Sequence, residues 1–481
     1  MEENHDLKYI KRSSIISLFG LFFQSGYSAI LGLGANLVLT ILLTPAIFGI
    51  YFTVLSTISL LNYFSDIGLA ASLIQKKEIS DEDVKTTFTL QQILIIVIIT
   101  IGFLLTPLIV SFYKLPDEGK YLFWSLLMSF FISSLKTIPS VFLERKIQFQ
   151  KIVLVQIIEN TFFYSSVIIF ALSGIGLRSF TYAVVLRAIT GLIAIYSISF
   201  WKPQIGISQK SLKSLLSFGL PFQTASFLAL FKDDLITLYL GKTLGFTNLG
   251  YIGWAKKWAE APIRIIMDNI SRILFPVIAR IQHDQPKVSS VMEKIITYQT
   301  RLLAPTLIGL ALLMQPLIHV IPRYQKWEPA LPLFYLFCLS AFLSSYSTPF
   351  INLFNALGKA KTSLAFMAFW TIATWILVPL LTHLYGIYGF PLTLCLLSLS
   401  FVVVVIKARQ FIVFDLLKIT YSSLISTIIM SIFVFVFFSL LKESFVSLIL
   451  GAVLGLFSYY IVLLTIFRIN ILKEITTLFH P

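Results

Sequence analysis

The feature that most constrains this chain is a series of long apolar runs that recur from Ile15 to Phe467 with only short interruptions. A bilayer core about 30 Å thick is crossed by a helix of roughly 20 apolar residues. Hydrophobic residues fill 57% of the 481 positions and charged residues 12%, whereas soluble domains average roughly 45–50% and 25%. A water-soluble fold could not bury so much apolar surface, so we expect an all-α integral membrane protein.

Fourteen runs are predicted to be transmembrane helices. They cover residues 15–43, 46–65, 87–111, 120–143, 151–173, 177–200, 214–240, 248–272, 292–321, 330–355, 361–383, 386–407, 418–441 and 445–467. We predict two six-helix lobes plus two terminal helices, with an N-terminal lobe at 1–200, a cytoplasmic linker at 201–213, a C-terminal lobe at 214–410 and the last two helices within 411–481.

The distribution of basic residues predicts the orientation. Short cytoplasmic loops of membrane proteins carry an excess of Lys and Arg. With the N-terminus placed inside, 23 loop and terminal Lys and Arg residues fall on the cytoplasmic side and 7 on the other. We expect a multi-pass protein of the cytoplasmic membrane with both termini in the cytoplasm. The net charge of +15 is scattered as single residues and pairs, which does not predict a nucleic-acid partner.

Weak self-similarity predicts an internal repeat. FGLFFQS at Phe19 to Ser25 returns 199 positions later as FGLPFQT at Phe218 to Thr224, and Gly49 with Tyr51 recurs approximately as Gly250 with Tyr251. An even number of predicted helices separates the copies, so the two halves would have parallel topology. Such repeats are typical of transporters whose substrate site lies at the repeat interface. Shared apolar composition would produce similar matches without duplication.

Thirteen charged residues fall inside the apolar runs or directly at their ends, where charges are costly and mark functional sites or internal ion pairs. The basic ones are Lys136, Arg187, Lys232, Lys256, Lys257, Arg264 and Arg301, and the acidic ones are Asp66, Glu159, Asp233, Asp234, Glu260 and Asp268. The run at 248–272 holds five of them, and at roughly 2.5–3.5 kcal/mol each they would cost on the order of 12–17 kcal/mol facing lipid. That run must face water or protein.

Two interpretations of this run remain open. The helical periodicity places Lys257, Glu260, Arg264 and Asp268 on one stripe. As the lining of a water-filled cleft, the stripe would suit an anionic substrate, because Arg binds phosphate through a bidentate fork. Alternatively, its charges pair with one another, Lys257 with Glu260 and Arg264 with Asp268, at ordinary helix spacing.

Further candidates for the cleft flank that stripe. Lys256 and Lys232 would add positive charge, and acids such as Asp234 could carry a coupling proton or sodium ion. Trp254 and Trp258 lie one turn apart and could stack on sugar rings or belong to the interfacial aromatic belt, of which the belt is favoured.

The sequence argues against an enzyme. The five histidines are scattered without metal-ligand spacing, and the two cysteines both lie in apolar runs. We predict no catalytic residue, no metal site and no cofactor. A Gly-rich phosphate loop with a Lys is missing from the sequence, so transport would run downhill or be coupled to H⁺ or Na⁺.

Several segments together resemble a known family. They are LTPAIFGIY at 43–51, SDIGLAASLIQ at 65–75, LERKIQF at 143–149, FGLPF at 218–222, LFPVIARIQHD at 274–284, KWEPALP at 326–332 and ALGKAK at 356–361. In order and spacing the chain resembles the polysaccharide-transport branch of the MOP exporter superfamily, the Wzx-type flippases that move undecaprenyl-pyrophosphate-linked oligosaccharides.

The resemblance implies a MATE-like fold with a central cleft lined by helices one, two, seven and eight. It implies translocation of a lipid-linked repeat unit to the outer leaflet for surface polysaccharide such as O-antigen lipopolysaccharide, with membrane lipids, a polymerase and glycosyltransferases as partners. Many relatives carry a basic residue before the LTP turn, where this chain has Ile41, so helices seven and eight would supply the cations. The alternatives are an ion-coupled multidrug antiporter of the same superfamily and, less favoured, a membrane polymerase or glycosyltransferase.

Overall fold

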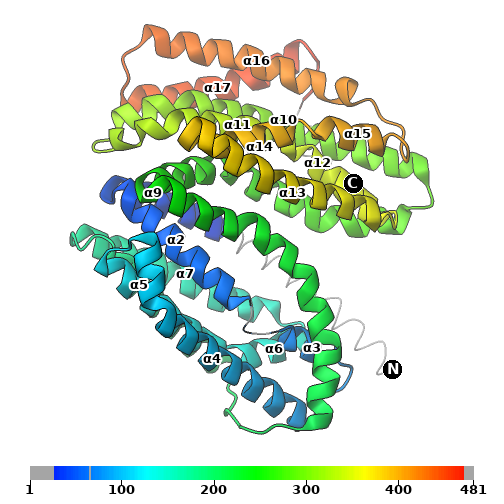
Figure 1. The fold of residues 1–481 in the computed structure, drawn as a ribbon. Helices are drawn as coiled ribbons and strands as arrows, with labels where there is room; N and C mark the ends of the chain where they lie inside the picture. The colour runs from blue at the N-terminus through cyan, green and yellow to red at the C-terminus, as the bar shows by residue number, and fades with distance from the viewer. Residues whose placement is uncertain (1–25, 64, 66, 471–481) are drawn as a thin grey trace. The chain divides into compact units, whose positions relative to one another are not determined.

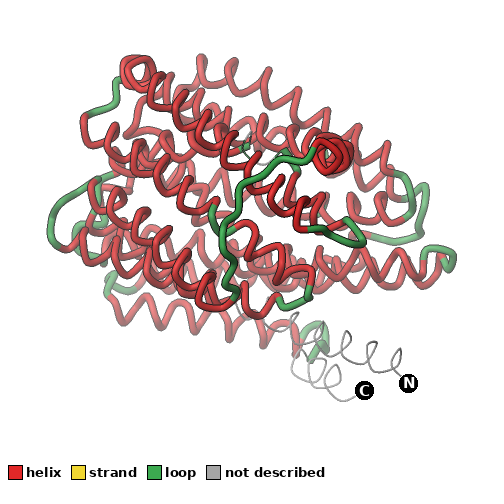
Figure 2. Tube along the Cα trace, turned by 90° about the horizontal axis from the view of Figure 1, so that it is seen from below, coloured by secondary structure: helices red, strands yellow, loops and turns green. Residues whose placement is uncertain are grey.

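A computed structural model describes residues 26–470 except 64 and 66, without the side chains of residues 62, 220–233, 268, 269, 272 and 273. All regular elements in this part of the chain are helices, which confirms the predicted all-α class (Figure 2). The chain divides into two compact units, one ending at Gly250 and the other beginning at Tyr251. The lobe boundaries drawn from the sequence stay a prediction. Residues 15–25, the start of the first predicted helix, lie outside the described residues.

The first unit holds the helices from Gly26 to the middle of α9 (Figure 1). They are Gly26–Leu42, α2 (Pro45–Asn62), α3 (Leu69–Gln75), α4 (Asp81–Tyr113), α5 (Asp117–Ser134), α6 (Thr137–Arg145), α7 (Phe149–Leu172), α8 (Arg178–Ile198) and the first part of α9 (Gln209–Ile281). Helix α8 packs against α7 and α5, and α2 and α4 also pack against α5.

The second unit holds the rest of α9 and the elements that follow it. They are α10 (Gln285–Val320), η1 (Gln325–Ala330), α11 (Leu331–Ser345), α12 (Ser347–Ala356), α13 (Ala360–Tyr385), η2 (Gly386–Tyr388), α14 (Gly389–Ser398), α15 (Phe401–Ala408), α16 (Leu416–Leu440) and α17 (Phe445–Thr465). Helix α10 packs against α11, α16 and α17, and α13 packs against α14.

Within the described residues, eight helical segments are long and apolar enough to cross a membrane, or nine if the bent pair α5 and α6 forms one span. One of the eight, Ala360–Ala408, covers two of the predicted runs and contains the break at η2. Large apolar side chains are exposed on these helices, for example Leu104 at 74% and Leu108 at 65%. Such surfaces require lipid as their solvent, so the protein is a multi-pass membrane protein. The count of fourteen helices stays a prediction.

Helix α9 differs in detail from the sequence prediction. Two runs separated by a loop at 241–247 were expected, but helix continues through this region and only Gly245 departs from helical geometry, with φ 77° and ψ 171°. An L-residue with a side chain rarely adopts this backbone conformation, so glycine allows the chain to change direction within one residue. The break separates the part of α9 that contains Asp234 from the part that contains Lys256, Glu260 and Arg264.

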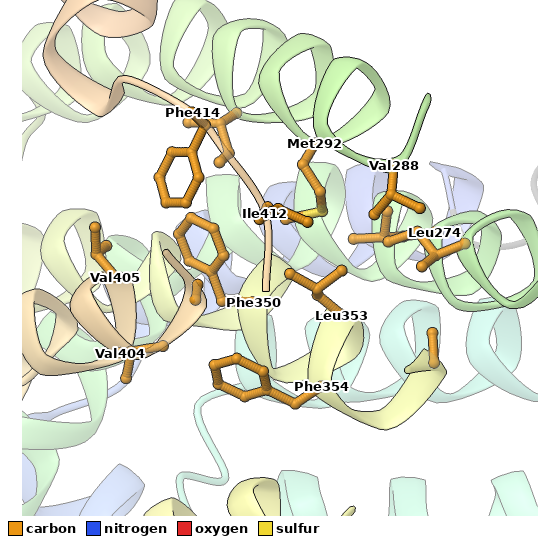
Figure 3. Packing of buried hydrophobic residues seen from close by; sticks show 14 of the residues in the cluster. Leu274, Val288, Met292, Phe350, Leu353, Phe354, Val404, Val405, Ile412 and Phe414 are labelled. Atoms are coloured by element: carbon orange, nitrogen blue, oxygen red, sulfur yellow. The ribbon is translucent and has the colours of Figure 1, made fainter. Parts of the chain in front are cut away.

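A phenylalanine-rich core lies within the second unit (Figure 3). Leu274 of α9 meets Met292 of α10 and Phe350 of α12 in this cluster, and all three are at most 1% exposed. The rings of Phe350 and Phe414 lie 5.1 Å apart between centroids. The packing fixes the C-terminal part of α9 relative to its neighbours in this unit.

Arg145 joins two of the sequence motifs in the first unit. Its guanidinium donates to the backbone carbonyl oxygens of Leu73 at 2.7 Å, Ile74 at 3.1 Å, Lys76 at 2.5 Å and Lys77 at 3.0 Å. These carbonyls lie at the end of α3, where a helix leaves acceptors without intrahelical partners and favours positive charge. The LERKIQF motif therefore caps the helix formed by the SDIGLAASLIQ motif.

Candidate substrate site

The polar stripe on α9 is built around one shared carboxylate. Glu260 lies 3.7 Å from the Lys256 ammonium and 3.1 Å from the Arg264 guanidinium, one turn to either side. The pairing of Glu260 with Lys257 that the spacing allowed is not formed, because Glu260 reaches back to Lys256 instead. Among the side chains of this stripe that the structure describes, two cations share one acid, which leaves an excess of positive charge.

The exposure of these side chains differs. The Arg264 side chain is 73% exposed, whereas those of Lys256 and Glu260 are 30% and 28% exposed. The Lys256 ammonium also lies 5.5 Å from the centre of the Phe390 ring, a distance at which a ring attracts a cation. Lys257 is exposed and forms no ion pair with another described residue. Arg264 and Lys257 are therefore the cations of this group most accessible to a ligand.

Two of the predicted site residues have side chains outside the described part of the structure. They are Lys232 and Asp268, so pairing of Arg264 with Asp268 and a contribution from Lys232 both stay predictions. Asp234 is described: its Oδ2 accepts a hydrogen bond from the Ser59 hydroxyl at 2.8 Å. This contact links α2 to the first part of α9 and gives the Asp234 carboxylate a polar partner inside the first unit.

The two predicted tryptophans have different surroundings. Trp254 is 2% exposed, its ring stacks 5.5 Å from that of Trp327, and its indole N–H donates to the Tyr324 hydroxyl at 3.0 Å. Through these contacts, Trp254 packs within a group of aromatic side chains. The indole N–H of Trp258 is buried and forms no hydrogen bond with another described residue. A sugar contact by either ring stays a prediction.

The first unit contains a second set of charged residues in its apolar helices, and the sequence did not predict that their side chains make contacts between helices. Lys136 pairs with Glu159, whose carboxylate fills the space beside Gly191, and Arg187 donates to the Asn160 side-chain oxygen at 3.1 Å. All three charges were recognised as intramembrane, but their partners lie 23 to 27 positions away on other helices. Helical spacing cannot reveal pairs of this kind.

The sequence matches a known protein family. Residues 38–332 match the family described as polysaccharide biosynthesis protein. The lipopolysaccharide biosynthesis protein WzxC of Escherichia coli K12 is 26% identical over 351 residues, which cover 71% of this chain and 69% of WzxC. The teichuronic acid biosynthesis protein TuaB of Bacillus subtilis is 24% identical and covers 72% of this chain and 70% of its own.

Solved structures show the same fold at low identity. The lipid II flippase MurJ in an inward closed conformation superposes with a TM-score of 0.74 at 14% identity, covering 94% of this chain and 99% of MurJ. An inward-facing multidrug resistance MATE family transporter of the MOP superfamily gives a TM-score of 0.60 at 15% identity, covering 83% and 98%. The chain thus shares the fold of MurJ and of this MATE transporter. By its sequence, the chain belongs to the polysaccharide biosynthesis protein family.

Proposed function

We propose that this protein flips an undecaprenyl-(pyro)phosphate-linked oligosaccharide repeat unit from the cytoplasmic to the outer leaflet by alternating access. The observation that carries the proposal is the shared carboxylate of α9, where Lys256 and Arg264 flank Glu260 and leave net positive charge. The family and the relatives of surface-polysaccharide biosynthesis support it.

The need for a cationic binding group follows from the free-energy cost of moving the polar headgroup of the substrate across the bilayer. Moving polar groups out of water without replacement hydrogen bonds costs roughly 2–7 kcal/mol each, and charges cost far more. Arg264 offers a charged, bidentate donor to a phosphate group. Glu260 competes for the same guanidinium, which keeps the interaction weak enough for release. Rocking of the lobes would expose the group to each leaflet in turn.

The proposal also includes the membrane in which the transporter lies and the enzymes that act before and after it. We place it in the cytoplasmic membrane with both termini inside, acting between glycosyltransferases that build the repeat unit and a polymerase that joins it. Transport is downhill or coupled to H⁺ or Na⁺. The rival function is an ion-coupled multidrug antiporter, for which the likeness to a MATE transporter supports the fold alone.

Arg264 variants test the proposal. Arg264→Ala should abolish export of surface polysaccharide while the protein still inserts, and Arg264→Lys should retain part of it because the charge remains but the fork is lost. Arg280→Ala is the matched control, since Arg280 is an exposed arginine on the same helix. Normal export by Arg264→Ala at normal expression would contradict the proposal. Rescue of Arg264→Ala by adding Glu260→Ala would assign Arg264 to ion pairing alone.

A further inference from the structure

Arg187 of α8 is an exposed cation placed midway along a membrane-crossing helix. It lies near the centre of α8 (Arg178–Ile198), and Asn160 lies near the centre of α7 (Phe149–Leu172), both of which are long and apolar enough to span the bilayer. A charge at this depth is costly in lipid and marks a functional site by default. We therefore expect Arg187 either to pair with another residue or to serve a function.

Helical geometry shows that Arg187 does not point toward lipid. The exposed apolar residues of α8 include Tyr182, Ile189 and Ile193, at 51%, 40% and 62% exposure. At about 100° per residue, Arg187 lies more than about 100° around the helix from each of them. It lies only about 40° from Gly191, which is buried. The exposed side chain of Arg187 thus lies on the side of α8 that faces the protein and not on the side that carries the exposed apolar residues.

The partner of Arg187 is neutral. Its Nη2 donates to the Asn160 Oδ1 at 3.1 Å, and no carboxylate pairs with it among the described residues. The other end of the Asn160 amide donates to the Ser28 hydroxyl at 3.1 Å, so both ends of the amide are engaged. The guanidinium also lies 5.5 Å from the centre of the Phe163 ring, one turn along α7. Asn160 and Phe163 therefore orient the guanidinium without cancelling its charge.

This arrangement contrasts with the stripe on α9, where Arg264 is in contact with the carboxylate of Glu260. A guanidinium carries five N–H donors, and one hydrogen bond to a neutral amide leaves most of them for a ligand. The group that such a fork recognises best is a phosphate or a carboxylate. Phosphate is the anion that the proposed substrate brings to this depth of the membrane.

We propose that Arg187, oriented by Asn160, is a binding residue for the phosphate or pyrophosphate group of the lipid-linked substrate. The inference rests on the proposed function and assigns a substrate-binding role to Arg187, on α8 in the first unit, by itself. Asn160 is a positioning residue: it holds the guanidinium toward the ligand through a bond to a neutral oxygen.

The decisive variant is Asn160→Asp. It keeps the size of the side chain and the link between α7 and α8, but it gives Arg187 a negative partner. If Arg187 serves only to join the two helices, this variant should bind ligand as the original protein does. If Arg187 binds an anion, the added carboxylate should compete with the ligand and weaken binding by at least about threefold.

The measurement is the dissociation constant of undecaprenyl pyrophosphate for the purified full-length protein in detergent, obtained by thermophoresis. Arg187→Gln should weaken binding at least about tenfold and Arg187→Lys less. Arg178→Gln is the control on the same helix, because Arg178 already lies 3.7 Å from Glu118 and should change binding by less than about twofold. A melting curve for each variant separates a folding defect from a binding defect.

Competitors identify the source of the anion. Inorganic pyrophosphate should compete weakly, neutral undecaprenol should not bind through Arg187, and phosphatidylglycerol should not displace the ligand. Displacement by phosphatidylglycerol at equal concentration would assign Arg187 to bulk lipid and overturn the inference. Unchanged binding in Arg187→Gln or in folded Asn160→Asp would also overturn it while leaving the proposed function intact. Failure of the unaltered protein to bind undecaprenyl pyrophosphate would instead count against the proposed function.

Discussion

Gly49 and Gly250 lie in reciprocal contacts between α2 and α9. A Cβ added to Gly49 would lie 1.8 Å from the carbonyl oxygen of Phe246, and one added to Gly250 would lie 1.9 Å from that of Pro45. Pro45 and Phe246 are separated by the same number of positions as the two glycines. A two-fold relation between the repeated segments predicts this reciprocity, and glycine is required on both sides because the backbones touch.

Substitution of either glycine should separate these two segments. Gly49→Ala and Gly250→Ala should each destabilise the protein by roughly 1–3 kcal/mol, the usual cost of overpacking. Thermal unfolding of the purified protein would measure the change. Gly34→Ala is the control: this glycine also lies in a helix, but its added Cβ meets nothing within 4 Å. Equal melting temperatures for Gly49→Ala and Gly34→Ala would show that the close contact is not needed for stability.

The capping role of Arg145 gives a second prediction. Arg145→Ala should lower the free energy of unfolding by about 2 kcal/mol or more, because charged hydrogen bonds to the end of α3 are lost. Arg145→Lys should recover only part of this, since an ammonium cannot reproduce the planar fork. Lys146→Ala, at the exposed neighbouring position, should be close to neutral. Equal proteolysis of the α3 region in Arg145→Ala and Lys146→Ala would contradict the capping role.

A third prediction concerns the ion pair of the half-buried Lys136 with the buried Glu159. Removal of one partner from a buried ion pair costs about 3–5 kcal/mol, because the other charge is left uncompensated. Lys136→Met should therefore be strongly destabilising, and adding Glu159→Gln should restore much of the loss. Melting curves for the two single variants and the double variant form the cycle. A double variant less stable than Lys136→Met would contradict coupling between the two charges.

The orientation can be tested with single cysteines in a background without Cys338 and Cys395. Lys442→Cys lies between α16 and α17 and should react with an impermeant thiol reagent added to intact cells. Lys287→Cys, at the start of α10, should react only after the membrane is permeabilised. Both native lysines are exposed, so access to water is matched. Labelling of Lys287→Cys in intact cells would contradict the predicted orientation.

Long apolar runs were sufficient to predict the membrane class and the approximate helix positions, because lipid forces every spanning segment to satisfy its own backbone. Details that depend on single residues were not accessible. Gly245 breaks α9 where a longer loop was expected. Glu260 could reach Lys257 or Lys256 by spacing alone, and the side-chain conformation selects Lys256.

Contacts between distant segments account for the remaining differences. Trp254 packs on Trp327, which lies beyond α10 in the chain, so its burial could not be deduced from its position one turn from Trp258. The hydrogen bonds between Arg187, Asn160 and Ser28 connect three helices. Each residue is unremarkable in its own segment, and only the packing of those helices brings them together.

The most direct test of lipid-linked oligosaccharide flipping uses the purified protein in liposomes that contain a fluorescent undecaprenyl-pyrophosphate-linked oligosaccharide. An impermeant quencher reports the fraction of label in the outer leaflet. The unaltered protein should make nearly all of the label accessible, whereas Arg264→Ala should leave about half protected, as in protein-free liposomes with label in both leaflets. Protection of half the label by the unaltered protein, together with ion-driven uptake of a cationic dye, would contradict the flippase and support the antiporter.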